Sequence, residues 1–201
     1  MNETAIGFKE WLVVCNALMA GRQSMILRKG GIAEGRAGFS FQHDAFFLFP
    51  THFPQQADLV TEDWSRPDLD LGAEREKEAD ASRIVRIECF GKLETNVVLR
   101  DWAQVEALQS EHIWKPEVIR ERFDYEGEQC LSMAFVRVYR LNEPWEFPFH
   151  RSYGGCRSWV TLPDSAPSMD QMTAVLSDEQ YAVRRTKLAP LIEGEGGKIG
   201  S

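Results

Sequence analysis

Residues 130–141, CLSMAFVRVYRL, are the stretch that decides the fold class. Successive side chains alternate between two faces, a pattern that is typical of a β-strand. Alternation places Ala134, Val136 and Val138 on one face and Phe135, Arg137 and Tyr139 on the other. This is the strongest strand signal in the chain, and the rest of the fold is predicted outward from it.

Away from this strand, shorter strand and helix patterns follow one another without regular alternation. Further strands are predicted at residues 24–27, 39–43, 45–49, 83–93 and 158–162. Helices are predicted at residues 8–20, 101–108, from 116 onward, 169–176 and 178–188, the last two capped by Ser168 and Ser177. Such an order disfavours a parallel doubly wound sheet, in which strands and helices alternate. We therefore predict an α+β fold: a small mixed or antiparallel β-barrel with an N-terminal helix, helices at the barrel ends and C-terminal helices.

The composition is that of one globular domain with appendages. The chain has 201 residues, of which 43% are apolar, enough to bury a core. We expect one domain at residues 1–162, a helical appendage at 163–192 and a flexible, glycine-rich tail at 193–201. Within the domain, residues 61–81 carry eight acidic and three basic side chains and no apolar stripe. That segment is predicted to be a solvated acidic linker insertion.

Charge and targeting signals narrow the function class. The net charge of −8 argues against broad nonspecific binding of nucleic acid, which needs many cations on one face. No run reaches the length of a membrane span, and the first residues lack the order of a signal peptide. We expect a cytoplasmic protein with no membrane partner, and four separated cysteines that stay reduced.

Candidate catalytic residues are few. The sequence has no phosphate-binding glycine loop and no HExxH motif, and its four histidines lack metal-ligand spacing. No cofactor and no metal are therefore expected. A metal-dependent nuclease or nucleotide hydrolase would need acids and a lysine close together, for which Glu88, Lys92, His43 and His112 are the candidates. The prediction leans away from an enzyme.

Two clusters contain more cations, glycines and aromatic rings than a core requires. The first consists of Arg22, Gln23, Arg28, Lys29, Gly30 and Gly31. At a solvated hairpin end, its guanidinium groups and bare backbone would suit a phosphate or the edge of a base. The second contains Tyr153 and Trp159, which could stack a base. The structural alternatives are a solvated hairpin for the first cluster and a tight turn with a core tryptophan for the second.

Several strings together carry a resemblance to a known family. They are ALMAGRQSMILRKGGIAEG, FSFQHDAFFLFPTHFPQQ, HIWKPEVIRERF, FVRVYRL and YGGCRSWVTL. Over residues 6–162 the chain resembles an uncharacterised bacterial domain of unknown function, number 1802. This resemblance implies a bacterial protein linked to restriction-modification, and it implies no specific activity.

A deeper resemblance concerns the first basic cluster. A helix that ends at Gly21 and Arg22, followed by a strand that ends at Arg28, resembles the opening motif of ASCH domains in the PUA-like superfamily. PUA-like barrels commonly hold a nucleobase or an RNA segment in a cleft beside this helix. A small amidohydrolase of the ASCH group has a lysine where this chain has Gln23 and a threonine where it has Ile26. The resemblance therefore implies a PUA-like barrel with a pocket, and it does not extend to that hydrolase chemistry.

The leading prediction is a PUA-like module that binds nucleic acid or a modified nucleotide without chemistry of its own. In it, Arg22, Arg28 and Lys29 meet phosphate or base edges, and Trp159 or Tyr153 stacks. The first alternative is the nuclease or nucleotide hydrolase described above. The second is a scaffold that binds a protein partner through helices at residues 169–188.

Overall fold

The computed structural model describes residues 4–29, 41–52, 54–61, 64 and 83–192. The strands are β1 (Ile6–Trp11), β2 (Met25–Arg28), β3 (Ala45–Thr51), β4 (Ile84–Leu99), β5 (Leu131–Pro148), β6 (Trp159–Thr161) and β7 (Met172–Ala174). The α-helices are α1 (Leu12–Met19), α2 (Trp102–Ala107), α3 (Pro116–Asp124) and α4 (Asp178–Ile192). The fold is therefore α+β, as the sequence predicts.

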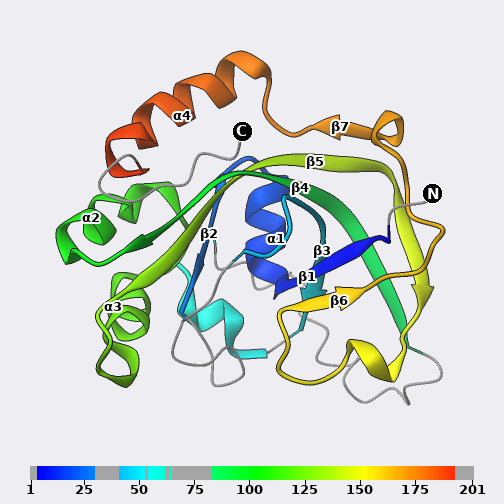
Figure 1. The fold of residues 1–201 in the computed structure, drawn as a ribbon, viewed down its shortest axis with the longest axis horizontal. Coiled ribbons are helices and arrows are strands. Elements are labelled where there is room, and N and C mark those ends of the chain that lie inside the picture. The colour runs from blue at the N-terminus through cyan, green and yellow to red at the C-terminus, as the bar shows by residue number, and fades with distance from the viewer. Residues whose placement is uncertain (1–3, 30–40, 53, 62–63, 65–82, 193–201) are drawn as a thin grey trace.

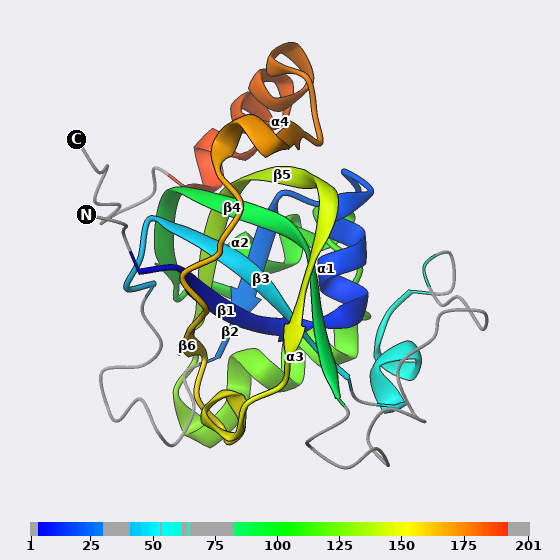
Figure 2. The ribbon, with the colours of Figure 1, turned by 90° about the vertical axis from the view of Figure 1, so that its right-hand side faces the viewer.

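The described strands form one mixed sheet that curves but does not close. Its order is β2-β5-β4-β3-β1-β6, and β7 pairs with β5 beyond this path. Only β1 and β3 are parallel within this set, and the other neighbours are antiparallel. Figures 1 and 2 show the sheet curving around α1. The predicted barrel is thus an open sheet, because β2 and β6 lie at opposite ends of the strand order.

The hairpin of β4 and β5 is the longest feature of the sheet. Its ladder runs from Ile84 paired with Pro148 to Leu99 paired with Leu131, and its register shifts twice, between Ile87 and Cys89 and between Leu93 and Thr95. Bulges of this kind bend a strand and increase its twist. They give the pair the curvature that wraps the sheet around α1. Both strands are longer than the sequence pattern predicts.

Helices cover both faces of this hairpin. Helix α1 buries five of its eight residues, Val13, Val14, Cys15, Ala17 and Leu18, in the main core. Helix α4 lies across the other side of β5 in both views, where the Tyr181 ring stacks on Phe135 with centroids 5.0 Å apart. Phe135 and Val136 point to opposite faces of β5, and both side chains are fully buried. Both faces of the strand are therefore covered at this point.

Two predicted helices are wrong in part. Residues 8–11 belong to β1, because that segment inserts between β3 and β6, and only Leu12–Met19 is helical. Residues 169–176 are not an α-helix: a short 3-10 turn capped by Ser168 leads into β7, which pairs with β5. In both places strand pairing overrides a helical spacing of apolar residues.

The helices predicted near residues 101–108, from 116 and at 178–188 are confirmed as α2, α3 and α4. None of the helices in the described part of the chain has the length and apolar character needed to cross a bilayer. Gly30, Gly31, the tail at 193–201 and almost all of the acidic segment 61–81 lie outside the described residues. The predicted strand at 39–43 lies partly outside them, and its described residues 41–43 form no strand. The division of the chain at residue 162 stays a prediction.

Candidate functional site

The cations of the first predicted cluster point to three different places. Arg22 donates to the carbonyl of Ser110. Arg28 turns inward, where it donates to the carbonyl of Lys9 and pairs with the buried carboxylate of Glu10 at 3.4 Å. These residues do not form the solvated rim that the sequence predicts, because backbone carbonyls and one carboxylate engage them.

Lys29 and Gln23 are engaged in the same way. The Lys29 ammonium donates to the carbonyls of Phe123, Glu128 and Cys130, at the end of α3 and the start of β5. Gln23 is buried: its amide nitrogen donates to the Met25 carbonyl, and its amide oxygen accepts from the Ile113 backbone. Gln23 thus ties β2 to the segment before α3.

The second predicted cluster is divided between two aromatic groups. Tyr153 is buried among Phe49, Phe147 and Phe149. The Trp159 ring packs on Phe8 with centroids 4.7 Å apart. Both therefore lie in packed aromatic surroundings, as the structural alternative predicts, although the Trp159 indole nitrogen is buried without a hydrogen-bond partner.

The candidate catalytic residues lie apart. Glu88 pairs with Arg86 at 3.1 Å, and Lys92, farther along β4, lies over the ring of Tyr139 on β5. His43 packs edge-on against Trp159. The buried His112 accepts a hydrogen bond from the Trp114 backbone, and burial lowers its pKa to about 4. Within the described part of the chain, no three His, Cys, Asp or Glu side chains converge as a metal site requires.

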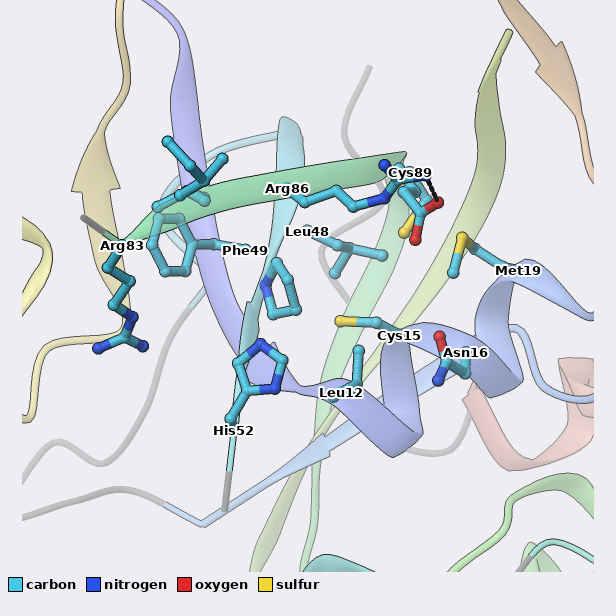
Figure 3. Close-up of a pocket in the computed structure, with 14 residues that line it drawn as sticks. Leu12, Cys15, Asn16, Met19, Leu48, Phe49, His52, Arg83, Arg86 and Cys89 are labelled. Carbon is cyan, nitrogen blue, oxygen red and sulfur yellow. Dashed lines mark hydrogen bonds and ion pairs between the residues drawn. The ribbon is translucent and has the colours of Figure 1, made fainter. Parts of the chain in front are cut away.

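A pocket opens where β3 and β4 separate. The ladder between them is three pairs long and ends at Phe47 and Phe90. Beyond it, β3 continues beside β1 while the start of β4 continues beside β5, and α1 lies behind the gap. The cavity has a volume of about 220 Å³. We call it the wedge pocket; its lining is Leu12, Cys15, Asn16, Met19, Leu48, Phe49, Pro50, His52, Arg83, Ile84, Val85, Arg86, Glu88 and Cys89 (Figure 3).

The wedge pocket combines apolar walls with a few polar groups. Leu12, Leu48 and Phe49 supply apolar surface, and the polar side chains of Asn16, on α1, and His52, directly after β3, also line the pocket (Figure 3). The facing edges of β3 and β4 no longer pair with each other here, so the peptide groups on these edges have no strand partner across the gap. This pattern, a mostly apolar cavity with few polar groups, is common in small-molecule sites.

The two arginines that line the wedge pocket differ in whether an acidic side chain neutralises them. Figure 3 shows Arg83 and Arg86 extending in different directions from the start of β4. Arg86 is neutralised by Glu88 and Glu146, the latter at 2.6 Å. Arg83 lies over the Phe149 ring at 4.5 Å, and the described structure gives it no acidic partner. The cation that remains for an anionic guest is therefore Arg83.

Two thiols lie at the back of the wedge pocket. Cys15 and Cys89 are free and fully buried, and burial raises the pKa of each thiol. A buried protonated thiol is a poor nucleophile and a poor metal ligand. The arrangement favours binding over covalent chemistry.

Sequence reasoning missed the wedge pocket because its residues come from three separate segments with no shared motif. The available signals were Asn16, a polar residue inside an apolar helix, and His52, directly after the apolar run of β3. Neither signal indicates a site until the fold places α1 behind the gap between the strands.

Comparison with known families agrees with the strings noted in the sequence. The sequence profile of the domain of unknown function DUF1802 matches residues 7–187. The chain belongs to the DUF1802 family. No curated protein matches this DUF1802 chain.

Solved structures similar to this DUF1802 chain are ASCH proteins from Zymomonas mobilis, as the second resemblance predicts. The crystal structure of ASCH has a TM-score of 0.44 and 13% identity, covering 94% of this chain and 95% of that one. A tyrosine-to-phenylalanine mutant of the same protein has a TM-score of 0.45 and 11% identity, covering 80% and 91%. No activity of this DUF1802 chain follows from likenesses at this level.

Proposed function

We propose that the chain binds a nucleotide or a single-stranded nucleic-acid segment, with one base in the wedge pocket. The observation that carries the proposal is the gap between β3 and β4, a cavity of about 220 Å³ with unpaired strand edges and one unneutralised cation. Sites for drug-sized ligands are roughly 300–1,000 Å³. This smaller cavity suits a single ring system.

The chemistry of the walls supports a base as the guest. A planar heterocycle presents donors and acceptors at its edge and apolar faces above and below. Leu12 and Phe49 offer contact to the faces, and the Asn16 amide, with one donor group and one acceptor, offers contact to the edge. Arg83, which also lines the pocket, would offer its guanidinium group to a phosphate attached to that base.

The test is an equilibrium titration with nucleoside 5′-monophosphates and short single-stranded RNA and DNA oligonucleotides at low salt. Arg83→Gln should weaken binding about ten- to a hundredfold, because a charge-assisted hydrogen bond contributes roughly 1.5–3 kcal/mol. Asn16→Leu should weaken it without changing the dependence on salt. The matched control is Arg100→Gln, which removes the same charge from an exposed position after β4.

Two results would contradict the proposal. One is a wild-type protein that binds none of these ligands at low salt. The other is equal affinity of the Arg83→Gln and Arg100→Gln variants. A link with restriction-modification, the hydrolase alternative and the scaffold alternative stay predictions from the sequence, and no contact in the described residues favours them over binding.

A further inference from the structure

Arg122, on α3, is a cation for which the described part of the chain supplies no hydrogen-bond partner. Its guanidinium group lies over the Trp114 ring at 3.9 Å from the centroid and over the Trp11 ring at 5.0 Å. Neither ring accepts its N–H groups as an oxygen atom would, and no hydrogen bond or ion pair engages them within the described residues. Its five donors therefore face aromatic surfaces and solvent, with no oxygen atom of the described residues to accept from them.

The acids near Arg122 do not pair with it in the described part of the chain. Glu10 and Glu121 favour its charged form, and the Glu10 side chain is 4% exposed. That carboxylate is already engaged, since it pairs with Arg28 at 3.4 Å and accepts a hydrogen bond from the Trp11 backbone. Glu121, the neighbour of Arg122 on α3, is exposed, and within the described residues neither carboxylate forms an ion pair with the Arg122 guanidinium group.

Burial makes this unpaired charge costly. Burial is the main reason that the pKa of Arg122 is lowered to about 10; the nearby Arg28 acts in the same direction, and Glu10 and Glu121 oppose both. A buried charge is stable when a partner compensates it, and an uncompensated one destabilises the fold. Cation–π contact with two tryptophans offsets part of that cost. An oxyanion would supply the hydrogen bonds that the rings cannot.

A ligand can reach this group from solvent. Arg122 and Trp11 are only half-buried, and the Arg28 side chain is 23% exposed. Figure 1 shows α3 beside the end of β2, where Lys29 donates to the Phe123 carbonyl. None of these residues lines the wedge pocket, so the group is a separate place on the molecule.

We propose that Arg122 and Arg28 form an oxyanion site, walled by Trp11 and Trp114, that binds the phosphate or carboxylate group of a small ligand. Arg122 supplies the free guanidinium fork, which matches two oxygen atoms of such a group. Glu10 holds Arg28 in place and limits the site to one anionic group. This inference does not depend on the proposed function of the wedge pocket.

The test measures thermal unfolding and tryptophan fluorescence during titration with inorganic phosphate and, separately, with acetate. Potassium chloride at matched ionic strength is the reference. When the anion concentration is ten times the dissociation constant, anion binding should raise the Tm of the wild type by about 3–6 °C above the reference. A larger response to phosphate than to acetate identifies a phosphate site, and the reverse identifies a carboxylate site.

Two variants locate the effect. Arg122→Gln should lose the anion-dependent rise in Tm, while Arg120→Gln should keep it. Arg120 is the matched control because it lies on the same helix, over Trp102, and is already paired with Asp124 at 2.5 Å. Persistence of the full rise in Arg122→Gln would overturn the proposal, as would a wild type that responds to neither anion beyond chloride.

Glu10→Gln provides an independent test that does not depend on the folding of Arg122→Gln. Glutamine keeps an acceptor for the Trp11 backbone but removes the negative charge that competes for Arg28. Anion affinity measured by tryptophan fluorescence should rise at least threefold in this variant. Unchanged or weaker affinity would show that the carboxylate does not face the bound anion, and would overturn the site.

Discussion

At the residue scale, Arg28 shows how position in the fold changes the role of a cation. As the last residue of an exposed hairpin strand, it would be replaceable at little cost. In the structure its guanidinium group instead links β2 to β1, where it contacts the Lys9 carbonyl and the Glu10 carboxylate. It also lies over the Phe8 ring at 4.9 Å. Arg28 therefore stabilises the fold whatever else it binds.

Arg28→Ala should lower the free energy of unfolding by about 2–3 kcal/mol. Breaking a buried ion pair costs roughly 3–5 kcal/mol, and partial exposure of Arg28 together with the nearby Arg122 reduces that value. Urea denaturation at pH 7 measures the change. Arg100→Ala, an exposed control, should change stability by about 0.5 kcal/mol or less. Equal stability of the two variants would show that Arg28 is solvated, as the sequence alone suggests.

His112 predicts a dependence of stability on pH. Burial lowers its pKa to about 4 in the folded protein, against 6.5 when exposed. The folded state thus favours the neutral ring, so the stabilisation is complete above pH 6.5 and is lost as the pH falls from 6.5 toward 4. The loss should reach roughly 3 kcal/mol, at about 1.4 kcal/mol per pKa unit.

The control for this effect is His112→Asn, whose side-chain oxygen can still accept from the Trp114 backbone. Denaturation curves at pH 7, 6 and 5 should show a steeper loss of stability in the wild type than in the variant. Carboxyl groups titrate in both proteins, so the difference isolates the histidine. Parallel pH profiles would mean that His112 is accessible to protons in the folded state.

At the element scale, the β7–α4 segment packs against the end of α1. Arg184 donates to the Gly21 carbonyl, and Arg137 pairs with Asp178 at 2.6 Å. Gly21 ends α1 with φ of +66°, and a Cβ atom there would lie 2.8 Å from Leu176 Cδ2. The C-terminal segment thus closes over the glycine that the sequence identifies as a helix stop.

Gly21→Ala should lower the free energy of unfolding by about 2 kcal/mol. The left-handed conformation costs a residue with Cβ roughly 1–2 kcal/mol, and the contact with Leu176 adds to it. In the double variant with Leu176→Ala, the two losses should be less than additive, because one change relieves the contact made by the other. Strict additivity in thermal denaturation would argue that Leu176 does not pack on Gly21.

The sequence predicts elements well where the local pattern and the tertiary pairing agree. The strand at residues 130–141 and the helix that begins at Pro116 are examples, since alternation and a first-turn proline are local signals. It fails at residues 8–11 and 172–174, because strands β1 and β7 exist only through partners far away in the chain. The wedge pocket could not be predicted for the same reason, because the separation of β3 from β4 depends on how the whole sheet pairs.

At the scale of the whole molecule, the net charge of −8 limits how nucleic acid can bind. The wedge pocket offers one unneutralised cation, Arg83, so few phosphates can be contacted. The slope of log K against log salt for a single-stranded oligonucleotide should therefore be shallow, about −0.7 for one phosphate contact by Arg83. A steep slope, below about −4, measured by fluorescence anisotropy would indicate an extended basic surface and contradict binding at the wedge pocket.

The most direct test of the central claim is an NMR titration of the ¹⁵N-labelled protein with a nucleoside 5′-monophosphate. We expect the largest shifts at the Asn16 side chain and at the backbone amides that line the gap between β3 and β4, which are those of Leu48, Phe49, His52, Arg83, Ile84, Val85, Arg86, Glu88 and Cys89. Shifts confined to other surfaces, with the amides of the wedge pocket unchanged at saturation, would contradict this claim.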